Sequence, residues 1–431
     1  MGNAEFELRS FDRFKKPFTT IFKSYSIIIF DRGLIILCYQ NEKIMLLKNK
    51  IIAVIGGGPG GLTLARLLQM KGYKVKVYER DEDQYVRQQG ATLDLHEESG
   101  LKALIAADLL NEFKKHYRPN ADKLRITDHN AVIHVDDHTS GAPLEKSGAS
   151  FRPEIDRGPF RDLLIASLEK DTLVWNSKFV SMQSLDDGWN ILFDNGNSAY
   201  ADLVIAADGA NSRLRKYLTR IAPIYSGLTI VEGNIYHAAT HAPKLWKLVN
   251  GGKIFALGME KSIILSAKGD GSLSFYTGTK EKEEWVKTSG INFENKQEIY
   301  DWFKERFTDW GSEWHELFES DDSYFVPRPQ YHFPPDQQWE SLSNLTMLGD
   351  AAHRMPPYAG EGVNMAMFDA LELVEQLTAP DVSDIKTAIS KYERAMCQRA
   401  AEITEVTLQS MENMHSKEGL KFLVDMFRLI H

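Results

Sequence analysis

A glycine-rich segment, residues 56–61, contains the first residues whose types and spacing suit a chemical role. Gly56, Gly58 and Gly61 fit the spacing G-x-G-x-x-G. In this motif the first glycine permits a tight turn, the second lets the backbone approach a pyrophosphate, and the third lets a helix pack closely on a strand. Glu79 follows Gly61 by 18 residues, where a carboxylate can accept hydrogen bonds from ribose hydroxyls. The combination predicts a dinucleotide whose pyrophosphate meets a helix N-terminus.

Two motifs within residues 345–365 indicate which dinucleotide to expect. Asp350 follows a predicted strand and stands where open α/β sheets place ligands, so its carboxylate can hold a ribityl hydroxyl. Residues 360–365, GEGVNM, begin a predicted helix whose backbone N–H groups can point at a ring that becomes anionic when reduced. An NAD dehydrogenase needs neither feature, whereas a flavoprotein needs both. The sequence therefore favours FAD, bound without a covalent link.

Apolar patterning shows which elements must position these motifs. Residues 51–55 form a short apolar run typical of a buried parallel strand, residues 62–68 have helical spacing, and residues 74–78 resemble the next strand. Together they predict a βαβ unit. Residues 179–200 contain Asp-Gly and Asn-Gly turns between apolar stretches and predict a small antiparallel meander.

The middle and the end of the chain have different patterns. Residues 225–335 predict strands and an aromatic helix, and a further helix is expected from Ser383 onward. The expected strands are residues 201–207, 254–257, 262–267, 272–277 and 345–348, and the aromatic helix carries Trp302, Phe303, Phe307 and Trp310. These aromatic residues are expected to form core rather than cofactor contacts.

Composition excludes several classes of protein. Hydrophobic residues at 43% and charged residues at 26% fit a globular chain of 431 residues with a sizeable core. A net charge of −9 lacks the basic excess of nucleic-acid-binding proteins, so no nucleic-acid partner is expected. Cys38 and Cys397 cannot form a disulfide framework, which favours a reducing, cytoplasmic compartment. No apolar run reaches the roughly 18 residues of a transmembrane segment. We expect a monomer.

The first 47 residues differ from the rest. The first 50 contain nine Lys or Arg against five Asp or Glu, and their apolar stretch is interrupted at Asp31 and Arg32. We expect an appended or poorly ordered extension, and Met45 is a possible translation start. A targeting segment or a peripheral membrane anchor remains an alternative.

Other chemistries have weaker support. His353 is an acid–base candidate because it lies close to Asp350, but a packed residue at a strand end is the favoured interpretation. His237 and His241 would share one helix face, yet no carboxylate or cysteine completes a metal site, so no metal is expected. The sequence contains neither G-x-S-x-G nor H-E-x-x-H, which excludes the corresponding hydrolases.

Several sequence blocks, in one order, resemble a known family. The chain is similar to the FAD-dependent aromatic hydroxylases of p-hydroxybenzoate hydroxylase type, and within them to the tetracycline-inactivating flavin monooxygenases. The resemblance extends from about residue 48 to about residue 410. It rests on the blocks GGGPGGLTLARLL, VYERD, GATLDLHEESG, PEIDRGPFRDLLIASLEKDTLVW, ADLVIAADGANSRLRK and GDAAHRMPPYAGEGVNMAMFDAL.

The resemblance implies a role for each residue that matches a family motif. The AMP half of FAD would be held by Gly56, Gly58, Gly61, Glu79 and Arg80. The flavin and its linker would contact Asp94, Arg157, Asp350, Pro357, Gly362, Val363 and Asn364. Arg87 matches an arginine associated with NADPH, although a solvated loop charge is an alternative. Asp208, in the Asp-Gly fingerprint linked to FAD and NADPH, departs from the Asn expected in the tetracycline enzymes.

The resemblance also implies the reaction. NADPH, with NADH as an alternative, would reduce FAD, and the reduced flavin would react with O2 to form a C4a-hydroperoxide that hydroxylates an aromatic or polyketide-like substrate. Glu232, Lys253 and Ser274 align with Gln, Arg and His residues that hold the drug in the tetracycline enzymes, so tetracycline itself remains open as a substrate. A flavin oxidase or reductase on the same scaffold, and a non-catalytic flavin-binding redox sensor, are the alternatives.

The implied fold is α/β. A Rossmann-like FAD-binding domain, with a parallel sheet and a β-meander, would carry a mostly antiparallel α+β substrate domain and a C-terminal bracing helix. The expected divisions are residues 1–47 for the extension, 48–224 and 336–382 for the FAD-binding domain, 225–335 for the substrate domain, and 383–431 for the C-terminal helical segment.

Overall fold

The computed structural model describes residues 46–86, 90–138, 152–320 and 323–430, and three short strands before residue 46. The chain divides into two compact units, residues 1–45 and 46–431. The sequence did not predict the three strands of the first unit, which form an antiparallel sheet in the order β1-β2-β3. They are β1 (Thr19–Phe22), β2 (Tyr25–Phe30) and β3 (Gly33–Leu37).

The second unit contains a parallel five-stranded sheet with the order β10-β5-β4-β14-β20. Its strands are β4 (Ile52–Ile55), β5 (Val75–Tyr78), β10 (Leu173–Val174), β14 (Leu203–Ala206) and β20 (Leu345–Met347). The helical elements on this side of the unit are α1 (Pro59–Met70), η1 (Glu97–Leu101), α2 (Lys102–Ala106), α3 (Leu110–His116), α4 (Arg157–Ala166), η3 (Arg215–Tyr217), α9 (Asp350–His353), η5 (Pro357–Ala359) and α10 (Gly362–Thr378).

The parallel sheet confirms the expected Rossmann-like arrangement. Every residue of β4 and β14 is buried, as expected for strands covered on both faces. The chain leaves β4 toward β5 on one side, while β14 pairs with β4 on the other side. Open α/β sheets bind ligands at such a switch point, next to the carboxyl ends of the strands. The first glycine motif begins directly after β4.

Two smaller sheets complete this part of the unit. The predicted meander is present as β11 (Phe179–Leu185), β12 (Gly188–Phe193) and β13 (Ser198–Ala201), which pair antiparallel in that order. A two-stranded ladder joins β6 (Leu93–Asp94) to β9 (Glu154–Ile155) and places Asp94 opposite Glu154.

A mostly antiparallel seven-stranded sheet has the order β19-β15-β18-β17-β16-β7-β8. The strands are β7 (Leu124–Asp128), β8 (Ile133–Asp136), β15 (Ile224–Ile235), β16 (Lys253–Gly258), β17 (Lys261–Ala267), β18 (Leu273–Lys280) and β19 (Phe325–His332). The strands β7 and β8 were not predicted from the sequence to belong to this sheet. They come from the expected first part of the FAD-binding domain, and β7 joins β16 in parallel, which no local pattern reveals.

One face of the seven-stranded sheet packs into an apolar core. Residues such as Ile263, Leu265, Phe275 and Trp314 are fully buried there, and Trp302 packs with them. The covering elements are α5 (Ala238–His241), α6 (Pro243–Val249), α7 (Trp285–Thr288), α8 (Lys296–Arg306) and η4 (Ser312–Phe318). The expected aromatic helix ends at Arg306, so Phe307 and Trp310 follow it, but both are core residues as expected.

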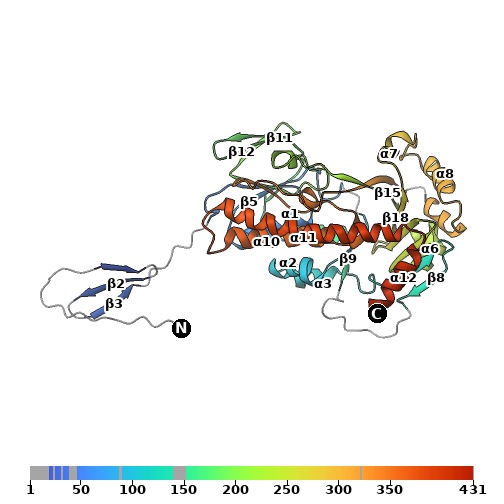
Figure 1. The fold of residues 1–431 in the computed structure, drawn as a ribbon, viewed down its shortest axis with the longest axis horizontal. Coiled ribbons are helices and arrows are strands. Elements are labelled where there is room, and N and C mark those ends of the chain that lie inside the picture. Colours follow the sequence, from blue (N-terminus) through green and yellow to red (C-terminus); the bar gives the residue numbers. More distant parts are fainter. Residues whose placement is uncertain are drawn as a thin grey trace. The chain divides into compact units, whose positions relative to one another are not determined.

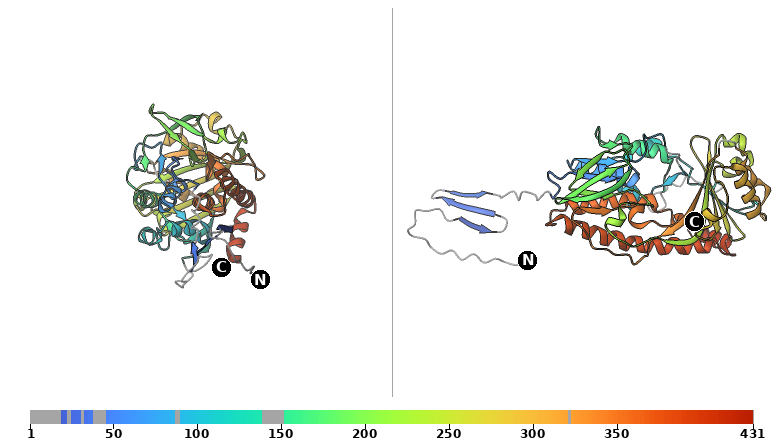
Figure 2. Two further views of the ribbon diagram at one scale, coloured as in Figure 1. Left: turned by 90° about the vertical axis from the view of Figure 1, so that its left-hand side faces the viewer. Right: turned by 90° about the horizontal axis from the view of Figure 1, so that it is seen from above.

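The bracing helix is α11 (Ile385–Met414), followed by α12 (Gly419–Ile430). Figure 1 shows α11 alongside α10 near its start and reaching β15 and β18 at its far end, and Figure 2 shows the same span from above. Tyr392 and Met396 are buried in the core of the parallel sheet, whereas Met411 packs with Leu228 and Ile230 of the seven-stranded sheet. One helix therefore contacts both sheets. None of the described helices is long and apolar enough to cross a membrane.

Candidate FAD-binding and substrate site

The first glycine motif has the geometry that its spacing predicts. Gly56 has φ of +117°, and a Cβ there would lie 2.2 Å from the Ala207 carbonyl oxygen. A Cβ at Gly61 would lie 2.2 Å from the Gly56 carbonyl oxygen, which explains why α1 can pack so closely on β4. Around Gly58, by contrast, a Cβ would meet no atom within 4 Å. The backbone at Gly58 is therefore open to an approaching group, and no side chain caps α1.

Glu79 lies beside this motif and is buried. Its Oε2 accepts a hydrogen bond from the Gly57 N–H at 2.7 Å, and its Oε1 accepts one from the Asp81 N–H at 3.1 Å. A carboxylate oxygen can accept more than one hydrogen bond, so these contacts are compatible with the ribose hydroxyls expected here. Arg161 Nη2 lies 3.8 Å from Glu79 and 3.0 Å from Asp81, and thus supplies the buried positive charge. Arg161 was not predicted from the sequence, although it lies in the PEIDRGPFRD block.

Asp350 is the first residue of α9, directly after β20 and Gly349. Its side chain is accessible, and no hydrogen bond engages its carboxylate in the described ranges, which makes it a ready acceptor. Burial nevertheless raises the pKa of the Asp350 carboxyl, against the opposing effects of His353, Arg354 and Arg157. The Asp350 carboxylate is thus close to protein atoms but accessible, and it could accept hydrogen bonds from a chain of hydroxyl groups.

A buried network beneath Asp350 holds this loop in place. Asp369 of α10 is fully buried and accepts the Gly349 N–H at 2.9 Å, His353 Nε2 at 2.5 Å and Arg399 Nη2 at 2.7 Å. Burial acts to raise the pKa of Asp369, but His353 and Arg399 prevail and lower it. His353 is therefore a packed residue that positions the loop, in line with the favoured interpretation.

Arg215, from the block after Asp208, supports the same loop from the other side and was also missed. Its Nη1 donates to the carbonyl oxygens of Ala351 and Ala352 at 3.1 and 2.8 Å, and its guanidinium stacks on Phe333 with 3.5 Å to the ring centroid. Burial lowers the pKa of Arg215 to about 10. Asp208 itself accepts the Arg213 N–H at 2.8 Å and so stabilises the following turn.

The second glycine motif brings α10 against β6. No side chain caps α10, and a Cβ at Gly362 would meet no atom within 4 Å. Asn364 is fully buried, accepts the His96 N–H at 2.9 Å and donates to the Asp94 carbonyl oxygen at 3.0 Å. Asp94 and Asn364 are thus brought together as predicted, while Val363 is half-buried and Pro357 exposed on the neighbouring loop.

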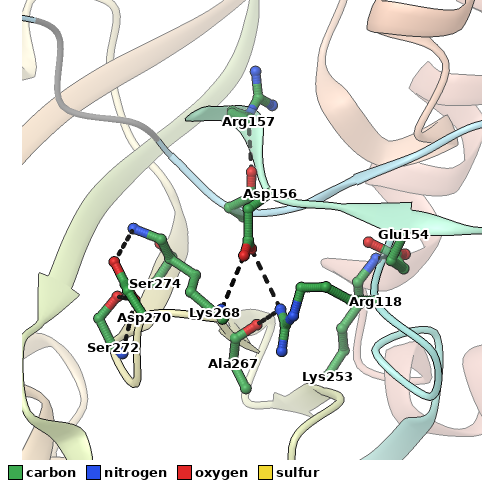
Figure 3. Close-up of polar contacts among 12 residues, drawn as sticks. Arg118, Glu154, Asp156, Arg157, Lys253, Ala267, Lys268, Asp270, Ser272 and Ser274 are labelled. Carbon is green, nitrogen blue, oxygen red and sulfur yellow. Dashed lines mark hydrogen bonds and ion pairs between the residues drawn. The ribbon is translucent and has the colours of Figure 1, made fainter. Parts of the chain in front are cut away.

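Arg157 begins α4 next to the seven-stranded sheet. Asp156 anchors this helix start: its Oδ1 pairs with Arg118 Nη1 at 3.3 Å and its Oδ2 accepts the Gly269 N–H at 2.9 Å. Figure 3 shows the Arg157 side chain directed away from this cluster. Arg157 Nε donates to the Ala91 carbonyl oxygen at 2.9 Å, and the rest of its guanidinium is exposed.

The three residues expected to contact substrate share the other face of the seven-stranded sheet. Ser274, Ser266 and Lys253 are cross-strand neighbours on β18, β17 and β16, and Glu232 pairs with Tyr276. This face meets the loops of the FAD side, because the Ala91 N–H donates to the Tyr276 hydroxyl at 3.1 Å.

Each of the three has a partner that the sequence did not reveal. Glu232 is buried and forms an ion pair with Arg328 of β19. Lys253 pairs with the buried Glu154, as Figure 3 shows. Burial raises the pKa of the Glu154 carboxyl, and Lys253 opposes this effect.

Ser274 is fully buried, and its hydroxyl donates to Asn234 Oδ1 at 3.4 Å. The substrate role therefore remains a prediction for all three residues.

The segment around η5 is held by α11 and by His415, the residue that follows α11. Thr407 Oγ1 donates to the Pro356 carbonyl oxygen at 2.8 Å, and the Tyr358 hydroxyl lies 2.9 Å from His415 Nε2. His415 Nδ1 lies 3.2 Å from the Glu260 carbonyl oxygen, so Nδ1 carries the proton and Nε2 accepts from Tyr358. Burial lowers the pKa of His415 to about 4, which keeps this contact neutral.

The remaining predicted residues are less informative. Arg80 is exposed, with Nε 3.9 Å from Asp81 Oδ1. Arg87 lies outside the described residues. His237 and His241 have ring centroids 6.2 Å apart. In the part of the chain that the structure describes, no group of three His, Cys, Asp or Glu residues could hold a metal ion.

These observations fit FAD. Two helix starts present uncapped N–H groups, Gly58 and Gly362 leave the space beside them open, and Asp350 offers an accessible carboxylate. The pyrophosphate of FAD and a ring that gains negative charge each need a helix start with free N–H groups and open space. The hydroxylated linker between them needs an acceptor such as the carboxylate.

Comparisons with known proteins agree with this site. A family model described as FAD binding domain matches residues 49–148 and 336–407, which contain both glycine motifs. The chain is 26% identical over 426 residues to the monooxygenase asqM of Emericella nidulans, with 84% of this chain and 94% of the relative covered.

Two solved structures support the fold. HpxO of Klebsiella pneumoniae, complexed with FAD and uric acid, has a TM-score of 0.70 at 20% identity, covering 90% of this chain and 95% of that one. The tetracycline destructase Tet(51) has a TM-score of 0.62 at 19% identity, covering 88% and 95%. With the site described above, these similarities identify the chain as an FAD-dependent monooxygenase that resembles the aromatic hydroxylases of p-hydroxybenzoate hydroxylase type.

Proposed function

We propose that this chain uses NADPH or NADH, together with O2, to hydroxylate an aromatic or polyketide-like substrate. The balanced reaction consumes one NAD(P)H, one proton and one O2 for each substrate C–H bond that becomes C–OH, and releases NAD(P)+ and water. Bound FAD supplies the electron transfer and the activation of O2; the protein binds, orients and excludes water.

We further propose where each part of FAD lies. The pyrophosphate would meet Gly58 at the start of α1, the ribityl chain would donate to Asp350, and the ring would lie against residues 362–364 at the start of α10. The supporting features are the uncapped helix starts and the accessible Asp350 carboxylate.

The observation that carries the substrate proposal is the polar face of the seven-stranded sheet. It contacts the FAD side through Tyr276 with Ala91 and through Lys253 with Glu154. A flat phenolic or enolic ring system could lie between this face and the flavin, with Glu232, Lys253 and Ser274 as the candidate contacts. Relative to the tetracycline enzymes, Lys for Arg replaces a planar fork with a point charge, and Ser for His shortens the reach.

The test is a single-turnover experiment. The yellow protein is reduced anaerobically with NADPH, or separately with NADH, and then mixed with air and a candidate phenol or tetracycline. A product heavier by one oxygen, with 18O incorporated from 18O2, is the expected result. NAD(P)H oxidation that yields only peroxide with every substrate would instead indicate an oxidase. Tetracycline, if converted, is expected to show a high KM while flavin reduction proceeds normally.

A further inference from the structure

His96 lies between two carboxylates beside the start of α10. Its Nε2 is 2.9 Å from Asp94 Oδ2, and its Nδ1 is 3.0 Å from Glu361 Oε1. The three side chains are only partly exposed, at 10% for His96, 26% for Asp94 and 22% for Glu361. The residue that follows Glu361 is Gly362, the first residue of α10.

The hydrogen bonds determine the charge of His96. An ionised carboxylate only accepts hydrogen bonds, so with both acids ionised both ring nitrogens must donate, and the ring is an imidazolium. Burial acts to lower the pKa of His96, but the hydrogen bonds and charges of Asp94 and Glu361 prevail and raise it to about 9. The His96 bond also lowers the pKa of Asp94, although burial acts to raise it. The group thus carries a net charge of −1, and it would carry −2 without the imidazolium.

Among the residues that the structure describes, few other charges face this group. Arg152 Nη1 lies 4.0 Å from Asp94 Oδ2, and its side chain is 53% exposed. Lys253 acts on Asp94 at longer range, and Lys253 is itself paired with Glu154. Asn364 of α10 is neutral and bonds to backbone atoms of Asp94, His96 and Gly360. Of the described cations, His96 is therefore the principal positive charge that balances Asp94 and Glu361.

The net charge of Asp94, His96 and Glu361 affects a flavin ring at the start of α10, because that ring becomes anionic on reduction. The N-terminus of α10 attracts negative charge through its uncapped N–H groups and its dipole. Two unbalanced carboxylates next to that helix start would cancel this effect. One imidazolium between them restores it. The backbone of the same segment is connected to α10 through Asn364, which accepts the His96 N–H and donates to the Asp94 carbonyl oxygen.

We propose that His96 is a positioning residue whose positive charge, held between Asp94 and Glu361, raises the reduction potential of the bound flavin. This inference rests on the ring placement proposed above. It assigns to His96 an effect on the reduction potential that is exerted through its charge and its two carboxylate partners.

The test compares variants that change the charge in opposite directions. His96→Gln keeps a donor but removes the cation, whereas Glu361→Gln keeps an acceptor for Nδ1–H but removes one anion. At pH 7.5, His96→Gln is expected to make the reduction equilibrium of bound FAD about tenfold less favourable, a shift of about 30 mV to more negative potential. Glu361→Gln is expected to shift the potential to more positive values. His116→Gln, an exposed histidine on α3, is the control.

The pH dependence supplies a second readout. Because the His96 imidazolium loses its proton above about pH 9, the difference between wild type and His96→Gln is expected to shrink as the pH rises through that value. Shifts of the same sign in both variants, or no shift, would overturn the proposal. A loss of the local structure alone would move both potentials in one direction.

A third measurement applies if His96→Gln does not fold or loses FAD. In wild-type holoenzyme labelled with 15N-histidine, the His96 ring is expected to show two protonated nitrogens at pH 7.5 and to titrate well above pH 7. A ring that titrates below pH 7 would overturn the proposal. Absence of FAD from the wild-type protein would instead refute the cofactor assignment.

Discussion

Removal of the Asp350 carboxylate is expected to weaken FAD binding and to stabilise the apoprotein at the same time. Asp350→Ala removes the acceptor for the ribityl hydroxyls, and Asp350→Asn removes the charge but keeps one oxygen. The apoprotein effect follows because burial raises the pKa of this carboxyl, so folding disfavours its ionised form. A raised carboxyl pKa lowers the stability of the folded apoprotein as the pH rises through that pKa. At neutral pH, the Asp350→Asn apoprotein is therefore expected to have a larger free energy of unfolding than the wild-type apoprotein.

The magnitude of the binding effect follows from the hydrogen bond that the alanine side chain cannot accept. A hydrogen bond to a charged group contributes about 1.5–3 kcal/mol. Since about 1.4 kcal/mol corresponds to a tenfold change in Kd, Asp350→Ala is expected to weaken FAD binding by roughly 10- to 100-fold. Asp350→Asn should lie between Ala and wild type. In the wild type, FAD affinity is expected to fall as the pH decreases through the raised pKa, because protonation removes the charged acceptor.

Flavin fluorescence titration of the apoprotein gives Kd, and urea unfolding without FAD gives the apoprotein stability. Asp194→Asn, on an exposed side chain of the meander, is the matched control and should change neither quantity. Normal FAD affinity in Asp350→Ala would refute the assignment of Asp350 to the ribityl chain. An apoprotein made less stable by Asp350→Asn would refute the reasoning from burial.

Three further outcomes are expected. A chain that begins at Met45 should keep its flavin spectrum and its NAD(P)H oxidation rate, because residues 1–45 form a separate unit; loss of folding on truncation would contradict this. Gly56→Ala should abolish FAD retention and lower the Tm, since its Cβ would lie 2.2 Å from the Ala207 carbonyl oxygen; a variant with wild-type Tm and FAD content would refute that geometry. Asp369→Asn should reduce the free energy of unfolding by about 1–3 kcal/mol, because Arg399 loses the fully buried one of its two carboxylate partners and keeps Glu372; denaturant unfolding measures this, and an unchanged free energy of unfolding would show that the amide replaces the carboxylate.

Local chemistry made the cofactor site predictable. The backbone turns at Gly56, is open to an approaching group at Gly58, and lies in close contact with the preceding turn at Gly61. Each of these requirements selects glycine, and together they fix the spacing of the motif. The βαβ unit and the meander followed from apolar periodicity and from turn residues, both of which act within a few residues. The sequence therefore established the fold class, the FAD-binding motifs and the bracing helix.

Tertiary structure decided which distant side chains become partners. Glu232 meets Arg328 across the pairing of β15 with β19, 96 residues apart in the chain. Lys253 of the seven-stranded sheet meets Glu154 of the β6–β9 ladder, 99 residues away. His96 meets Glu361 across 265 residues, and Arg215 reaches Ala352 across 137. The periodicity that predicts a strand or a helix does not encode which remote strands pair, or in which register. For this reason the pairing of β7 with β16 could not be predicted from the sequence. The ionisation state of a residue such as His96 depends on these tertiary contacts, because burial and neighbouring charges shift its pKa away from the value typical of the residue type.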